Sequence, residues 1–392
     1  MEKKNTVPLL VVLSALVAGC NPDEPVVVDA SGNVVGGSAF DAVSSAETSS
    51  STEAFSSTST AASSAVSTAV PSSGSSRPAV SSSDSSVAVA APVQEAPRSV
   101  FQEWMETPFD CGEQSMTWHD ANDWHYQLQG VDYEQLANSK YDLLVIDSEP
   151  TVPPNKNVIN RLKCGGDGDK LLVSYMTVGQ AEEYRYYWGD DWEVGNPSWI
   201  VYPDLFWQGD YYVRYWEPEW RQILMGTPES RVDRIIAAGF DGIYLDVIDA
   251  YTFFEEENPN AIDEMQKLIK DISDYARALS GNPDFGVFVQ NAQELIEVVG
   301  PEWVEPLTGI GKEEAFYWAM DDRVADDFRY WNALYLAQWV EAGKVVLSVD
   351  YVTTAEHRAD ALADARAQGF VPLMLSDKDL DQMDQFPDHL PD

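Results

Sequence analysis

The chain has 392 residues and a formal net charge of −41, from 24 Lys and Arg against 65 Asp and Glu. So acidic a surface repels nucleic acid and other anionic polymers, which excludes nucleic-acid binding and suits a cationic substrate. Adaptation to a salty medium would explain the charge equally well.

The N-terminus has the features of a secretory signal. Residues 3–20 place two lysines before an apolar run that falls short of the about 20 residues of a membrane span. The run ends in Val17-Ala18-Gly19-Cys20, which resembles a bacterial lipobox. This resemblance implies that Cys20 is lipidated and anchors an exported protein in the bacterial envelope, at the outer membrane or the cell surface. The alternative is an ordinary signal peptide, 1–20, with a chance cysteine.

Composition divides the rest of the chain in two. Residues 21–98 are dominated by Ser, Ala, Thr, Val and Pro, a composition typical of a flexible tether. Residues 99–392 hold nearly all the Trp and Tyr, and their length suits one large α/β domain, expected to be monomeric. In this part Cys111 and Cys164 form an even pair in an oxidising compartment, so we expect a disulfide. A metal site is the weaker interpretation, because the histidines and cysteines show no ligand spacing.

The folded part alternates short apolar runs with amphipathic stretches, the pattern of a parallel sheet. The expected strands are His125–Gln129, Asp142–Asp147, Lys170–Met176, Gly242–Val247, Phe285–Asn291, Gly309–Glu314, Val345–Tyr351 and Phe370–Leu375. Helices are expected at Arg231–Ala238, with Gly239 as C-terminal cap, and at Asn260–Ser280, which has apolar residues at helical spacing. Eight β/α units in one domain predict an α/β fold of the (β/α)8 TIM barrel type.

A long insert, 177–230, separates the third and fourth expected strands and is rich in Tyr and Trp. An insert at this point lies over the face where barrel enzymes place their active sites. Its aromatic side chains could stack on sugar rings. They could instead form the core of a small hairpin, and the two interpretations are compatible for different residues.

Several acids stand where strands end. Side chains alternate along a strand, so Tyr244 and Asp246 of the fourth strand face the barrel interior. Other polar residues at the same mouth are Asp147, Glu149, Tyr175, Asn291, Glu313 and Asp350. Convergent carboxylates without histidine or cysteine suit glycoside cleavage, which needs an acid/base and a nucleophile or base. A divalent cation is the alternative, but EF-hand spacing is absent. Asp249 is the best candidate for a helix N-cap.

Five ordered segments resemble one family. They are YDLLVIDSEP, LLVSYMTVGQAEEYRYYW, GDYYVRYWEPEWRQIL, GFDGIYLDVIDAY and GIGKEEAFYW. They look like the signature segments of glycoside hydrolase family 114, which comprises endo-α-1,4-polygalactosaminidases and related barrel proteins. The resemblance spans about 120–376. The sequence departs from it at Gln180, where many relatives carry an acid.

The resemblance implies a retaining, endo-acting hydrolase of α-1,4-linked, galactosamine-containing polysaccharide, without cofactor or metal. Asp246 would be the nucleophile, its charge stabilised by donors such as Tyr175 or Asn291. Glu313 would be the general acid/base in a more apolar niche that raises its pKa. The residues expected to bind substrate are Asp147, Glu149, Tyr175, Tyr244, Asp249, Tyr251, Asn291 and Asp350. The alternative function is a non-catalytic, carbohydrate-binding envelope lipoprotein with the same fold.

Overall fold

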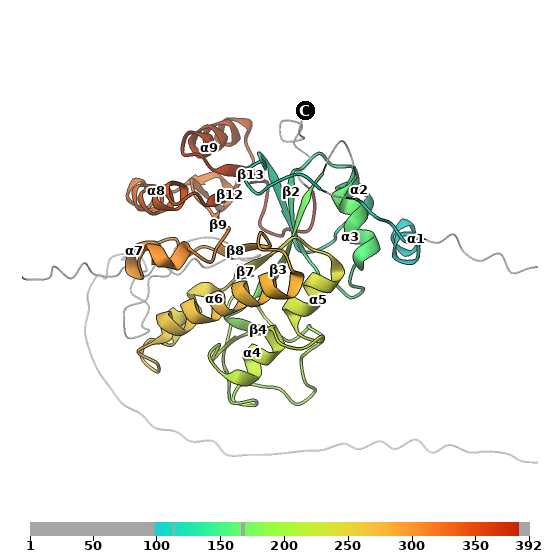
Figure 1. The fold of residues 1–392 in the computed structure, drawn as a ribbon. Helices are drawn as coiled ribbons and strands as arrows, with labels where there is room; N and C mark the ends of the chain where they lie inside the picture. Colours follow the sequence, from blue (N-terminus) through green and yellow to red (C-terminus); the bar gives the residue numbers. More distant parts are fainter. Residues whose placement is uncertain (1–98, 113, 166–168, 384–392) are drawn as a thin grey trace, which may run out of the picture. The chain divides into compact units, whose positions relative to one another are not determined.

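The computed structural model describes residues 99–112, 114–165 and 169–383 (Figure 1). The expected signal peptide, the lipidation at Cys20 and the tether lie outside these residues. One parallel sheet has the strand order β1-β2-β3-β7-β8-β9-β12-β13. Its strands are β1 Trp124–Gln127, β2 Leu143–Asp147, β3 Leu171–Thr177, β7 Gly242–Asp246, β8 Gly286–Gln290, β9 Gly309–Glu313, β12 Val345–Tyr351 and β13 Val371–Leu375. All eight expected strands are present, with ends displaced by at most two residues.

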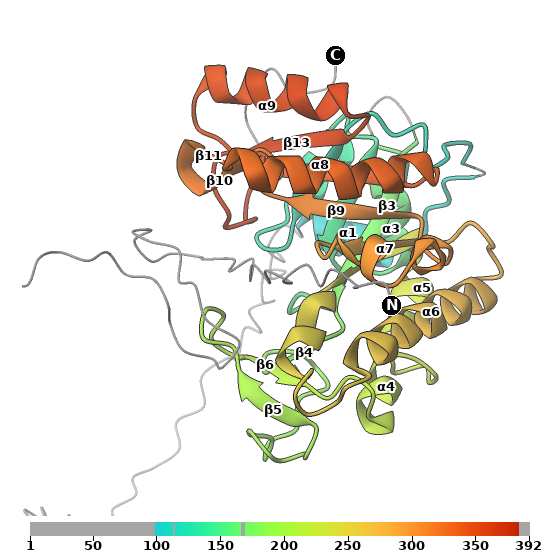
Figure 2. The same ribbon diagram turned by 90° about the vertical axis from the view of Figure 1, so that its left-hand side faces the viewer.

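The sheet is nearly closed into a barrel. The first and last strands meet through the segment after β13, where the Leu380 carbonyl accepts the backbone N–H groups of Leu128 and Gln129 at 2.8 and 3.0 Å. Figures 1 and 2 show helices arranged around the strands. This confirms the (β/α)8 TIM-like fold expected from the sequence.

Helices surround the sheet, and local sequence signals mark only some of their ends. Their bounds are α1 Val100–Glu106, α2 Tyr133–Asn138, α3 Lys156–Lys163, α4 Pro218–Leu224, α5 Arg231–Ala238, α6 Ala261–Ser280, α7 Leu295–Val298, α8 Asp326–Glu341 and α9 Ala355–Ala367. Helix α5 ends at Gly239, whose φ of 95° is the left-handed conformation that glycine adopts without steric cost. In the described part of the chain, no helix is both long and apolar enough to span a membrane.

Side-chain alternation on β7 sorts its residues between two cores. Ile243 and Leu245 pack in the cluster between the strands and the helices. Tyr244 packs in the second cluster, which fills the barrel interior. A Cβ atom at Gly311 would lie 1.6 Å from the Tyr244 hydroxyl, so only glycine at that position leaves room for the tyrosine. The predicted inward orientation of Tyr244 is therefore confirmed.

The insert folds as a small domain-like layer of its own. Its strands, β4 Gln180–Glu182, β5 Ile200–Pro203 and β6 Asp210–Val213, form an antiparallel sheet in the order β4-β6-β5 (Figure 2). Trp199 and Trp220 are buried, with ring centroids 5.3 Å apart. Tyr184, Tyr186 and Tyr202 are exposed. The insert thus has the expected aromatic core, and sugar stacking by its exposed tyrosines stays a prediction.

The cysteine pair is joined. Cys111, in the segment before β1, forms a disulfide with Cys164, which follows α3, and their Cα atoms lie 5.8 Å apart. The bond ties the N-terminal extension of the described domain to the helix layer, as the sequence predicted.

Candidate active site

Asp246, the last residue of β7, is partly open to solvent at the barrel mouth. Its Oδ2 accepts a hydrogen bond from the Tyr175 hydroxyl at 2.7 Å, and its Oδ1 accepts the Val247 N–H at 2.6 Å. The chain turns sharply after it, with Val247 at a φ of 58°. Burial raises the pKa of Asp246, while the two donors favour the charged carboxylate and oppose that rise. Tyr175 therefore is the donor expected from the sequence.

Glu313, the last residue of β9, is only 4% exposed. Its Oε2 accepts the Gln290 amide at 3.0 Å, and its Oε1 accepts the Tyr351 hydroxyl. Burial raises the pKa of Glu313 to about 7, although the Tyr351 hydrogen bond lowers it. A carboxyl with this pKa can hold or release a proton near neutral pH, which is what a general acid/base requires.

The two acids share one aromatic floor. Tyr126 and Tyr244 lie with ring centroids 5.6 Å apart. Burial raises the pKa of each phenol, and the charges of Asp246 and Glu313 raise it further. The charge of Asp246 also contributes to the raised pKa of Glu313. The two carboxylates lie at the ends of strands β7 and β9, which flank β8. These two tyrosines come from β1 and β7, and only Tyr244 of β7 was expected at the site.

Asn291 has a different role from the one expected. Its Oδ1 accepts the Lys312 ammonium at 3.1 Å and the Glu313 N–H at 3.2 Å. No hydrogen bond joins it to Asp246 among the described residues. Asn291 directly follows β8 and its own N–H donates to the Gly311 carbonyl of the neighbouring strand β9 at 2.8 Å, so groups of β9 are within reach of its side chain. Asn291 therefore supports the backbone of Glu313, and the expectation that it stabilises Asp246 is wrong.

Asp147 and Glu149 lie in a buried ion network. Arg185 of the insert donates to both oxygens of Asp147, at 2.7 and 2.9 Å, and to both oxygens of Glu182, at 2.8 Å each. Arg231, at the start of α5, donates to Glu149 at 2.9 Å. Protein cations therefore already pair with both carboxylates. Sequence reasoning missed the arginines, because they come from the insert and a helix rather than from strand ends.

Asp350 is fully buried, and its Oδ1 accepts the backbone N–H groups of Phe316 and Tyr317 at 2.7 and 2.8 Å. Burial raises the pKa of Asp350 to about 7. It anchors the segment after β9. Tyr251 is likewise buried, and its hydroxyl donates to Glu294 at 3.4 Å.

Asp249 does not cap a helix. The 3-10 helix η1, Ile248–Phe253, has Val247 at its N-cap position, and no side chain bonds there. Asp249 lies instead in the first turn, because the chain enters the helix directly after the turn at Val247. Burial, followed by the charges of Asp246 and Glu294, raises its pKa to about 7. Asp249 is therefore a further acid beside Asp246.

One face of the insert sheet adds polar groups next to β7. Cross-strand pairing sets Gln180 opposite Tyr212 and Glu182 opposite Asp210, all on one face by strand alternation. The Gln180 amide donates to Asp204 at 2.6 Å, a bond that an acid at position 180 could make only when protonated.

Asp210 is the acid of this face that has no partner. No described residue donates a hydrogen bond to its carboxylate, and its Oδ1 is buried. Burial, then the charges of Glu182 and Asp204, raise its pKa to about 8, and Asp246 contributes to the same rise. The Arg185 charge opposes this rise, but no described residue forms a hydrogen bond or ion pair with the Asp210 carboxylate.

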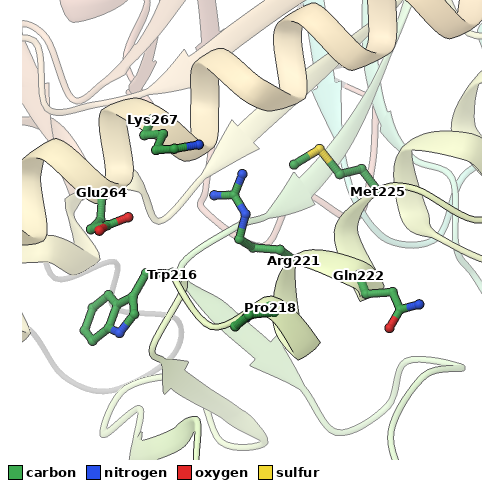
Figure 3. A pocket seen from close by; sticks show the side chains of 7 residues that line it. All are labelled: Trp216, Pro218, Arg221, Gln222, Met225, Glu264 and Lys267. Atoms are coloured by element: carbon green, nitrogen blue, oxygen red, sulfur yellow. The ribbon is translucent and has the colours of Figure 1, made fainter.

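The described acids at the barrel mouth form no metal-binding group, and the pocket between α4 and α6 lies apart from them. In residues 99–112, 114–165 and 169–383, no three His, Cys, Asp or Glu residues are grouped to hold a metal ion. A pocket of about 460 Å³ lies between α4 and α6 (Figure 3). Its lining residues are Trp216, Pro218, Arg221, Gln222, Met225, Glu264 and Lys267. It contains none of the acids at the barrel mouth.

Comparison with known proteins identifies similar chains. A model of the glycoside-hydrolase family GH114 matches residues 107–390. The chain is 32% identical over 276 residues to the uncharacterized protein MJ1477 of Methanocaldococcus jannaschii, covering 66% of this chain and 77% of that protein. It is 33% identical over 267 residues to an uncharacterized protein of Deinococcus radiodurans, covering 66% and 82%. Its fold is similar to the glycoside hydrolase domain of PelA from Pseudomonas aeruginosa, with a TM-score of 0.51, 17% identity, and coverage of 67% and 97%.

Proposed function

Because the chain belongs to glycoside hydrolase family GH114, we propose that it cleaves an α-1,4-linked, galactosamine-containing polysaccharide, within the polymer and with retention of configuration. The observation that carries this proposal is the pair of acids, Asp246 and Glu313, at the ends of two strands of one barrel mouth. Glycoside cleavage needs two carboxyl groups in different protonation states.

The environments of the two acids suggest their roles. Asp246 receives two hydrogen bonds and opens to solvent, so its carboxylate is the proposed nucleophile at the anomeric carbon. Glu313 is buried with a pKa of about 7, so it is the proposed donor of a proton to the leaving oxygen. After that donation its carboxylate can deprotonate the water that releases the glycosyl group from Asp246.

The charge beside Asp246 supports an amino sugar as substrate. Asp210 and Asp249 lie near it, and burial raises the pKa of both carboxyls. A protonated sugar amine would give the Asp210 carboxylate a direct partner, which no described residue provides by a hydrogen bond or ion pair. A neutral, fully acetylated polymer offers no such cation, and the Asp210 carboxyl would then keep its proton at neutral pH, because its pKa is raised to about 8. We therefore favour a polymer with free amino groups.

The proposed location is the bacterial envelope. Lipidation at Cys20 would hold the enzyme at a membrane, and stable attachment requires more than one acyl chain. A Ser-rich tether, 21–98, would then allow the barrel to reach polysaccharide away from the surface.

The test is a panel of amino-sugar polymers, acetylated and deacetylated, incubated with the full chain. Sizing of the products should show oligosaccharides of intermediate length from the deacetylated galactosamine polymer, which indicates endo action. Proton NMR of the first products should show the α anomer, which indicates retention. Binding of the polymer without any product would instead support the non-catalytic alternative.

A further inference from the structure

Both oxygens of the Glu313 carboxylate are held by neighbouring strands. Gln290, at the end of β8, donates to Oε2 at 3.0 Å. Tyr351, at the end of β12, donates its hydroxyl to Oε1. Since β8 and β12 are the two strands that flank β9, the carboxylate accepts hydrogen bonds from both neighbouring strands. Both donors are almost completely buried, so water does not replace them without a rearrangement.

A cation lies over the ring of the tyrosine. The Lys378 ammonium is 5.4 Å from the centroid of the Tyr351 ring and 2.6 Å from the Glu314 carboxylate. Lys378 belongs to the segment after β13, which the Leu380 carbonyl ties to the end of β1. The position of this cation over the ring is therefore set by the same segment that closes the barrel.

We propose that Tyr351, held beneath Lys378, is a positioning residue for the acid/base Glu313, aligning its carboxyl and favouring its ionised form. A phenol hydroxyl that donates to a carboxylate stabilises the charged state, and a nearby ammonium acts in the same direction. This inference rests on the proposed function and adds to it the group that controls when Glu313 carries its proton.

Opposing influences come from the other groups around Glu313. Those that carry or can carry charge are Tyr126 of β1, Tyr244 and Asp246 of β7, Lys312 of β9, Glu314 directly after β9, Tyr351 of β12 and Lys378 after β13. Burial raises the pKa of Glu313 to about 7, helped by the charges of Glu314 and Asp246. The Tyr351 hydrogen bond and the Lys378 charge lower it. Removal of either should therefore raise the pKa further.

The loss of either group should shift the pH dependence of kcat/KM. Glycosyl transfer to Asp246 needs protonated Glu313, so kcat/KM falls as pH rises through the pKa of Glu313. Tyr351→Phe removes the donor and keeps the ring. The falling limb of the plot of kcat/KM against pH should therefore move to higher pH, by roughly 0.5–1 pH unit for the loss of one hydrogen bond. Lys378→Met should move it in the same direction, whereas Lys378→Arg should leave it near its original place.

The experiment measures kcat/KM of the full chain on the deacetylated polymer between pH 5 and 9. Tyr330→Phe, on the exposed face of α8, is the matched control and should leave the limb unmoved. A second substrate, an aryl glycoside with a good leaving group, needs little proton donation. Its rate should therefore respond weakly to Tyr351→Phe, which a general loss of folding would not produce.

A direct titration separates this inference from the proposed function. Carbon NMR of labelled glutamate gives the pKa of Glu313 whether or not any polymer is cleaved, with Glu313→Gln assigning the signal. The pKa should rise in Tyr351→Phe and in Lys378→Met. An unchanged or lower pKa in both variants would overturn the inference, even if the wild type is active. Absence of cleavage with the expected rise would overturn only the proposed function.

Discussion

At the scale of single residues, two carboxyl groups on one barrel face acquire different chemistry from their surroundings. Asp246 keeps contact with solvent and has a tyrosine donor, while Glu313 is enclosed between Gln290 and Tyr351. Strand alternation in the sequence was enough to predict that Asp246 faces inward. The donors of Glu313 were beyond sequence reasoning, because Gln290 and Tyr351 come from strands 23 and 38 residues away in the chain.

Asp210 provides a residue-scale test of substrate charge. Asp210→Asn keeps the size of the side chain and removes its negative charge. On a deacetylated polymer, kcat/KM should fall by about ten- to hundredfold, since a charge-assisted hydrogen bond contributes about 1.5–3 kcal/mol. On an acetylated polymer it should change little. Asp191→Asn, an exposed acid of the same insert, is the control. An equal decrease of kcat/KM on both polymers would show that Asp210 does not bind the sugar amine.

At the scale of elements, the insert is fastened to the barrel by buried ion pairs. Arg185 bridges Glu182 of β4 and Asp147 of β2, and it has almost no solvent exposure. The strands and the helices α5 and α6 could be predicted from the sequence, because the residues that mark them are neighbours in the chain. The glycine cap of α5 at Gly239 is an example. The ion pair between Arg185 and Asp147 could not be predicted, because it depends on how the insert packs against the barrel.

Removal of this arginine should destabilise the protein. Arg185→Met leaves the buried Asp147 carboxylate without its cation and Glu182 with only Arg231, at 3.4 Å, which costs about 3–5 kcal/mol in the free energy of unfolding. Denaturant unfolding measures this loss. Arg234→Met is the control. Arg234 is partly exposed, and its guanidinium approaches the Glu149 carboxylate no closer than 3.9 Å, so this ion pair contributes about 1 kcal/mol or less. A loss below about 1 kcal/mol for Arg185→Met would contradict the fastening role.

At the scale of the whole molecule, the charge of −41 has two explanations that salt separates. If the acidic surface attracts a cationic polymer, kcat/KM should fall as salt rises, because the screening length shortens from about 10 Å at 0.1 M to 3 Å at 1 M. The acetylated polymer, being neutral, should show no such fall. A rate that stays flat or rises with salt on both polymers would favour adaptation to a salty medium.

Membrane attachment is a second property of the whole chain. Cys20→Ala removes the residue that the lipobox-like sequence marks for acylation. The variant should leave the membrane fraction or accumulate as a precursor, since a chain without acyl groups loses the apolar surface that holds it. Cell fractionation with immunoblotting measures this. Unchanged membrane association of Cys20→Ala would rule out anchoring through this cysteine.

The central claim is that Asp246 and Glu313 perform glycoside cleavage in a barrel of the GH114 family. The most direct measurement compares the products that the wild type, Asp246→Asn and Glu313→Gln release from deacetylated galactosamine polymer. Asp246→Asn should be inactive while binding the polymer normally. Glu313→Gln should lose nearly all polymer cleavage but retain activity on an aryl glycoside, whose leaving group needs less proton donation. Wild-type product yields from Asp246→Asn would contradict the account.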